Sequence, residues 1–142
     1  MNNFNQYSLI AILGIVTMAF VSFESNFQKD APPIHQLRIY QVPENNVKVF
    51  HERFRDHATR IMKKYNFNII AMWESKFNEK TEFIYLLQWE NKQTMDDSWK
   101  QFMADQEWKD IKKRTAELHG NYVDSIQNRT LIVTDYSPRK SF

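Results

Sequence analysis

Apolar and polar residues alternate over positions 35–41. Leu37 and Ile39 point to one side of the segment, and Arg38 and Tyr40 point to the other. A period of two residues is typical of a β-strand with one buried side. The sequence therefore predicts a short strand at this position.

The period changes to that of a helix over Glu44–Tyr65. Its apolar positions follow one another at steps of three and four residues, which places them in a single stripe: Val47, Phe50, Phe54, Ala58, Ile61 and Tyr65. Two apolar strands are expected next, at Phe67–Lys76 and Thr81–Glu90. The polar turn Asn78-Glu79-Lys80 between them predicts a hairpin.

A second helical stripe follows the hairpin and is interrupted at Asp105–Trp108. Gly120 comes two residues after the stripe ends, where a glycine often closes a helix. Tyr122–Tyr136 is rich in Val, Ile, Thr and Tyr and predicts a last strand. The order β-α-β-β-α-β is the split βαβ of ferredoxin-like α+β domains, a four-stranded antiparallel sheet with two helices on one face.

The third predicted strand has two different apolar sides. Ile84 and Leu86 form an aliphatic side, which we expect to pack beneath the helices. The other side would leave a large apolar patch in water, and we expect a second copy of the chain to cover it in a dimeric α/β barrel. The alternative is that a terminal segment buries this side. The predicted dimer interface consists of Phe83, Tyr85, Leu87 and Trp89.

The N-terminal part of the chain differs in character from the rest. Leu9–Val21 is an apolar run of thirteen residues, about 20 Å long as a helix and too short to span a bilayer. We expect residues 1–23 to be an export signal, with an uncleaved anchor over residues 7–23 and a buried core helix as alternatives. Residues 24–33 are expected to form a linker, and residues 139–142 a short tail. The protein would then be exported, periplasmic or secreted, or else membrane-anchored.

The amino-acid composition excludes several kinds of active site and ligand. The chain lacks cysteine, which excludes thiolate nucleophiles and Cys-ligated metals. Two glycines among 142 residues leave no phosphate-binding or dinucleotide loop, and a net charge of +2 does not favour nucleic acid. The four histidines are not spaced as metal ligands, so neither a metal nor another cofactor is expected.

Five residues are candidates for lining a cavity between sheet and helices. An arginine on a covered sheet face needs an anion, so Arg38 is expected to pair with Glu74 or to hold a ligand, with a solvent-facing arginine as the remaining alternative. His57 lies at the edge of the first helical stripe, where it could act as a general base or a haem ligand or simply be a partly buried histidine. No catalytic residue can be assigned. The candidates are Arg38, Tyr40, His57, Tyr85 and Trp89.

The spacing of several sequence blocks resembles the NIPSNAP family over residues 34–138. These blocks are HQLRIY, RDHATRIMKKYNF, AMWE, LLQWE, MADQEW and QNRTLIVTDYSP. Gln106 stands where the family often has proline, and Asn66 where it often has glycine. The resemblance implies a dimeric α/β-barrel fold but little about activity, because related barrels include cofactor-free monooxygenases and isomerases as well as haem-handling enzymes.

Two functions therefore remain open at this point. The first is an exported, homodimeric binding or interaction module, with a small hydrophobic molecule as a possible ligand. The second is a cofactor-free small-molecule enzyme, monooxygenase- or isomerase-like. The absence of an identifiable acid/base pair favours the first.

The export hypothesis predicts where the mature protein begins. N-terminal sequencing of the exported product should give a first residue between about Ser22 and Ala31, because the apolar run ends there. Recovery of the full chain from the membrane fraction would contradict cleavage and support the anchor.

Overall fold

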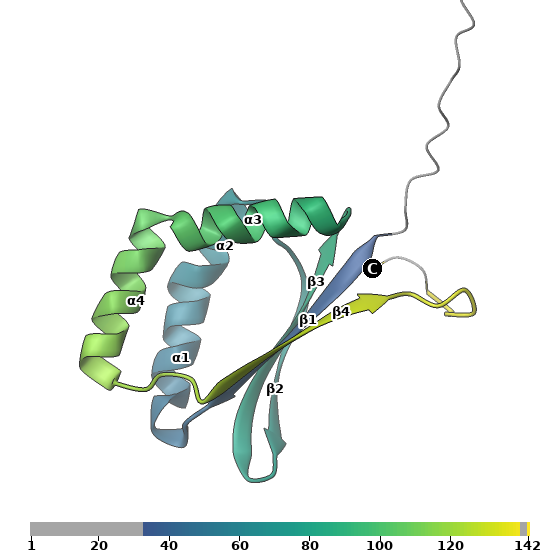
Figure 1. Ribbon diagram of the computed structural model, residues 1–142. Helices are drawn as coiled ribbons and strands as arrows, with labels where there is room; N and C mark the ends of the chain where they lie inside the picture. Colours follow the sequence, from purple (N-terminus) through teal and green to yellow (C-terminus); the bar gives the residue numbers. More distant parts are fainter. Residues whose placement is uncertain (1–32, 140–141) are drawn as a thin grey trace, which may run out of the picture.

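The computed structural model describes residues 33–139 and 142, so the expected leader and most of the expected linker lie outside the described residues. Four antiparallel strands form one sheet in the order β2-β3-β1-β4, as expected for a ferredoxin-like α+β fold (Figure 1). The order confirms the predicted topology. The strands are β1 (Ile34–Val42), β2 (Asn68–Phe77), β3 (Lys80–Trp89) and β4 (Ser125–Ile132).

Helices lie along one side of this sheet (Figure 1). The first predicted helix is a nearly continuous helical segment with a π-helical turn inside it. The second is broken in two, where the sequence stripe is interrupted. No helix in the described part of the chain is both long and apolar enough to cross a membrane. The helical elements are η1 (Glu44–Asn46), α1 (Val47–Arg53), the π-turn η2 (Phe54–Ala58), α2 (Thr59–Lys64), α3 (Lys92–Ala104) and α4 (Gln106–His119).

Local chemistry explains where the elements end. Asp105 breaks the second helix because its side chain caps α4, accepting a hydrogen bond from the backbone N–H of Trp108 at 2.8 Å. Asn78 and Glu79 both have positive φ, 47° and 63°, which suits a two-residue hairpin turn. Asn66, φ 60°, and Gly120, φ 63°, end their helices in a left-handed conformation. Glycine adopts it readily because it lacks a Cβ atom, and asparagine tolerates it better than most residues.

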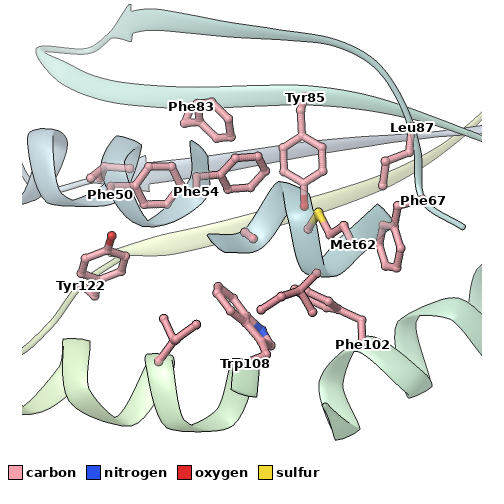
Figure 2. Packing of buried hydrophobic residues seen from close by; sticks show 14 of the residues in the cluster. Phe50, Phe54, Met62, Phe67, Phe83, Tyr85, Leu87, Phe102, Trp108 and Tyr122 are labelled. Carbon is pink, nitrogen blue, oxygen red and sulfur yellow. The ribbon is translucent and has the colours of Figure 1, made fainter. Parts of the chain in front are cut away.

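The prediction about the two sides of β3 is wrong. Phe83, Tyr85, Leu87 and Trp89 are 0–4% exposed within a single copy. Figure 2 shows Phe83, Tyr85 and Leu87 pointing toward the helices, and the centre of the Phe83 ring lies 4.6 Å from that of Phe54. This side therefore belongs to the core of one chain and is not a dimer interface. Large rings fill the space between a twisted sheet and the helices, and the smaller aliphatic side chains take the opposite side.

The side of the sheet away from the helices, here called the outer face, is also apolar. The strand register sets Leu37 opposite Leu86 and Ile39 opposite Ile84 at its centre. Trp73 on β2 and Leu131 on β4 flank this centre and are 50% and 39% exposed. Apolar side chains thus occupy the centre of this face on β1 and β3, with Trp73 and Leu131 beside them, and no helix covers them.

The corrected packing predicts how a core truncation behaves. Leu87→Ala should lower the free energy of unfolding by about 2–5 kcal/mol, because Leu87 is fully buried between sheet and helices. Leu118→Ala is the matched control, because Leu118 is 77% exposed and should change stability by less than about 0.5 kcal/mol. Urea unfolding measures both, and equal effects would contradict the assignment of β3's buried side.

Candidate functional site

The helix-facing side of β1 carries a row of polar residues, although the surrounding core is aromatic. Gln36, Arg38 and Tyr40 follow one another at every second position and therefore share this side. The register places Arg38 opposite Tyr85 and Gln36 opposite Leu87 on β3. Polar groups inside a core need hydrogen-bond partners from within it, and the structure shows which partners these are.

Arg38 and two tyrosines form one end of the row. The Arg38 Nη2 donates to the Tyr40 hydroxyl at 2.8 Å, and the Tyr40 and Tyr85 hydroxyls lie 3.3 Å apart. The Arg38 guanidinium lies 4.6 Å from the centre of the Trp99 ring and 5.3 Å from that of Tyr40. Aromatic faces attract a cation at such distances, so two rings and a hydroxyl position the Arg38 charge.

Gln36 connects the other end of the row to three elements. Its Oε1 accepts hydrogen bonds from the indole N–H groups of Trp89 at 3.1 Å and Trp99 at 2.8 Å. Its Nε2 donates to Asn128 on β4 at 2.8 Å. We call Gln36, Arg38, Tyr40, Tyr85 and Trp99 the Arg38 cluster.

Arg38 does not have the carboxylate partner that the sequence suggested. Glu74 instead lies 2.9 Å from the Nε2 of His51. None of the ion pairs between described residues includes Arg38, and its Nε atom is buried without a hydrogen-bond partner. A half-buried guanidinium without a counter-ion and with a free N–H donor is a place where an anion would be stabilised.

The β4 side of the Arg38 cluster faces water. Asn128, opposite Arg38 in the register, is exposed. Its neighbours on the same side of β4, Ile126 and Ile132, are 52% and 71% exposed. The helices therefore cover the inner side of β3, whereas the inner side of β4 beside the Arg38 cluster is exposed to solvent.

Tyr85 is held in its neutral form. Complete burial, and then the neighbouring Tyr40, raise the pKa of Tyr85 well above its usual value, and the Arg38 charge does not compensate. Its hydroxyl is therefore a hydrogen-bonding group at neutral pH. A phenol with so high a pKa is a poor general base there.

His57 is not part of this site. It is exposed and lines a groove between α1, η2 and α4, on a different part of the molecule. The sequence stripe placed it at the edge of the helix, and the π-turn at Phe54–Ala58 keeps Phe54 and Ala58 buried while His57 faces solvent. No group of three His, Asp or Glu side chains in the described ranges is arranged to hold a metal ion.

The sequence candidates on the strands are thus brought together, and others join them. Arg38, Tyr40 and Tyr85 meet directly, and Trp89 is connected to Arg38 through Gln36 and Trp99. Gln36, Trp99 and Asn128 were not anticipated. The alternation along β1 could have indicated Gln36, because it shares a side with Arg38, but nothing local to α3 or β4 points to the other two.

Comparison with known proteins now gives the family. The NIPSNAP family model matches residues 35–138. The chain belongs to the NIPSNAP family. No curated protein matches it.

Solved NIPSNAP structures share the fold of this chain. A NIPSNAP family protein from Agrobacterium tumefaciens superimposes with a TM-score of 0.65 at 20% identity, over 75% of this chain and 97% of that one. An uncharacterized NIPSNAP-like domain protein from Burkholderia xenovorans gives 0.63 at 18% identity, over 76% and 90%. A second Agrobacterium tumefaciens family protein, described as of unknown function, gives 0.64 at 13% identity, over 75% and 92%. Identities this low concern the fold alone.

Proposed function

We propose that this NIPSNAP protein is an exported, homodimeric binding module whose Arg38 cluster holds a small organic acid with an apolar body. The observation that carries the proposal is the half-buried Arg38 guanidinium without a carboxylate partner. Moving a cation away from water is costly unless an anion compensates. A bound carboxylate at the guanidinium would supply that anion.

The surroundings of Arg38 set the character of the rest of the ligand. The rings of Trp99 and Tyr40 flank the guanidinium, and Ile126 on β4 offers an exposed apolar surface on the same side of the sheet. Apolar walls with a few polar groups are typical of small-molecule sites. A hydrophobic acid fits these surroundings better than a sugar or a free inorganic anion.

Binding is favoured over catalysis by the protonation chemistry of the cluster. An enzyme that moves protons needs a group whose pKa lies near the working pH. Burial raises the pKa of Tyr85 away from that range, and His57 lies elsewhere. A cofactor-free enzyme remains the second hypothesis, and it would use Tyr85 only as a hydrogen-bond donor or weak acid.

The outer face supports the homodimer. It spans four strands of eight to ten residues, roughly 19 by 27 Å in plan at ordinary strand spacing. Its centre is aliphatic at Leu37, Ile84 and Leu86, with Trp73 and Leu131 exposed beside them. A second copy laid sheet to sheet would cover this face, about 500 Å² in plan. The relief of the side chains and the loops at its edges would supply the rest of the roughly 800 Å² per partner that a stable dimer buries.

The dimer proposal predicts a change of mass. The wild-type protein should have twice its monomer mass by light scattering, and Trp73→Glu with Leu131→Glu should be a folded monomer, because each carboxylate would be buried in the interface. Both side chains are at least 39% exposed in one copy, so circular dichroism should stay unchanged. Met103→Glu, at a 47% exposed position on α3, should remain dimeric. A monomeric wild type would contradict the proposal.

The ligand proposal predicts a charge-dependent thermal shift. Benzoate at a hundred times its dissociation constant should stabilise the protein by about 2.7 kcal/mol, a rise in Tm of several degrees, whereas the uncharged benzyl alcohol should not. Arg38→Met should abolish the benzoate shift, because it removes the only cation of the Arg38 cluster. Arg129→Met, at an exposed outer-face position of β4, is the matched control and should keep it.

Two results would contradict the ligand proposal. One is a benzoate shift of equal size in wild type and Arg38→Met. The other is the lack of any shift with benzoate, octanoate and phenyl phosphate alike. Chemical conversion of a bound probe that disappears in Tyr85→Phe would instead support the enzyme hypothesis.

A further inference from the structure

A second candidate site lies between α1 with η2 on one side and α4 on the other, away from the Arg38 cluster. It is a groove of about 590 Å³, here called the α1–α4 groove, and it includes no residue of the Arg38 cluster. Val49, Arg53 and His57 line one wall at steps of four residues, and Ile111, Thr115 and Leu118 line the other. The lining runs from Val49 to His57 on one wall and from Ile111 to His119 on the other, eight helical rises in each case, so the groove is about 12 Å long.

The π-turn shapes one wall of this groove. It adds a residue to the first helical segment at Phe54–Ala58 and so directs Asp56 and His57 toward the groove while Phe54 and Ala58 stay in the core. Such turns cost helical regularity and are frequent at functional sites.

The groove has more positive charge than its own acids neutralise. Asp56 pairs with Arg55 at 2.7 Å, and Glu52 lies 4.0 Å from Lys48 on the same helix. Neither acid pairs with Arg53 or Arg114, and no ion pair between described residues includes these two arginines. The two arginines therefore remain available to an acidic partner.

Arg53 is held in place by the core. Its guanidinium lies 3.7 Å from the centre of the Tyr122 ring and 5.2 Å from that of Trp108. Burial chiefly, and then the charges of Arg53 and Lys109, lower the pKa of Lys112 on the neighbouring face of α4. A positioned cation in such a region is ready to bind a carboxylate without further loss of side-chain freedom.

The shape of the groove favours a polypeptide over a small molecule. Arg114, His57 and His119 are exposed, and Leu118 is 77% exposed, so a small ligand would leave much of its own surface in water. Small-molecule sites usually enclose most of their ligand. A peptide lying along two helices can place an apolar side chain over Ile111 and Leu118 and carboxylates beside the arginines.

We propose that the α1–α4 groove docks an acidic segment of another protein, with glutamate or aspartate side chains at Arg53 and Arg114 and a leucine-like side chain over Leu118. This proposal goes beyond the small-acid site at Arg38 and shares no residue with it. It gives the interaction module a second, independent surface.

Fluorescence polarisation with the full chain tests the proposal, using a labelled peptide Glu-Glu-Leu-Glu-Glu-Leu-Glu. The peptide should bind, and a lysine-for-glutamate version should not. Arg114→Glu should weaken binding at least tenfold, because it replaces an exposed groove cation without touching the core. Leu118→Ser should weaken it severalfold. Lys100→Glu on α3 makes the same charge change outside the groove and should bind like wild type, as should Arg38→Met.

Three outcomes would overturn the proposal. One is no binding by the wild type. Another is equal weakening by Arg114→Glu and Lys100→Glu, which would show attraction by net charge alone. The third is binding of anionic phosphatidylserine vesicles, lost in Arg114→Glu, without binding of the peptide, which would assign the groove to a membrane surface. None of these outcomes bears on the Arg38 cluster, since benzoate binding is measured separately.

Discussion

Burial of the large side chains on β3 beneath the helices is the constraint on which the rest of the structure depends. Tyr85 and Leu87 are fully buried, and the rings of Phe54 and Phe67 pack against Phe83 and Trp89. Because these residues fix which side of the sheet meets the helices, they also fix where every residue of β1 points. Leu37 and Ile39 must face outward, and Gln36, Arg38 and Tyr40 must face the core.

This orientation places a row of polar residues inside the core. Some of them have all the hydrogen-bond or charge partners they need, and others do not. Gln36 accepts hydrogen bonds from two indole N–H groups and donates one to the Asn128 amide. Both ends of its side-chain amide therefore have partners, and its role is structural. Arg38 finds a hydroxyl and two rings but no acid. In the proposed function this cation binds an anion and contributes little to folding, a trade-off between stability and function that is typical of binding sites.

Much of the fold could be predicted from the sequence because it depends on periodicity and local chemistry. The hairpin at Asn78 and the break at Asp105 were recognisable from turn and capping residues. The side of β3 that meets the helices could not be predicted in this way. A period of two shows which residues share a side but not which side meets the helices, and both sides of β3 are apolar. The same ambiguity concerned Arg38, whose expected partner Glu74 instead binds His51.

The remaining site residues required the tertiary structure. Trp99 reaches Gln36 from α3 and Asn128 reaches it from β4, contacts between segments more than sixty residues apart in the chain. His57 lies on the first helical segment as expected, but the π-turn places it in the α1–α4 groove. Long-range packing therefore determines which residues join the Arg38 cluster, and one irregular helical turn determines where His57 lies. The periodicity of the sequence shows neither.

The central claim is that Arg38 is a ligand-binding cation and not a structural one. The unfolding free energy of Arg38→Met without any ligand tests it most directly. If Arg38 serves a ligand, a methionine of similar length should leave the protein as stable as the wild type or slightly more stable, because an uncompensated half-buried charge has been removed. A loss of 3 kcal/mol or more, in the range of about 3–5 kcal/mol typical of breaking a buried ion pair, would contradict the claim.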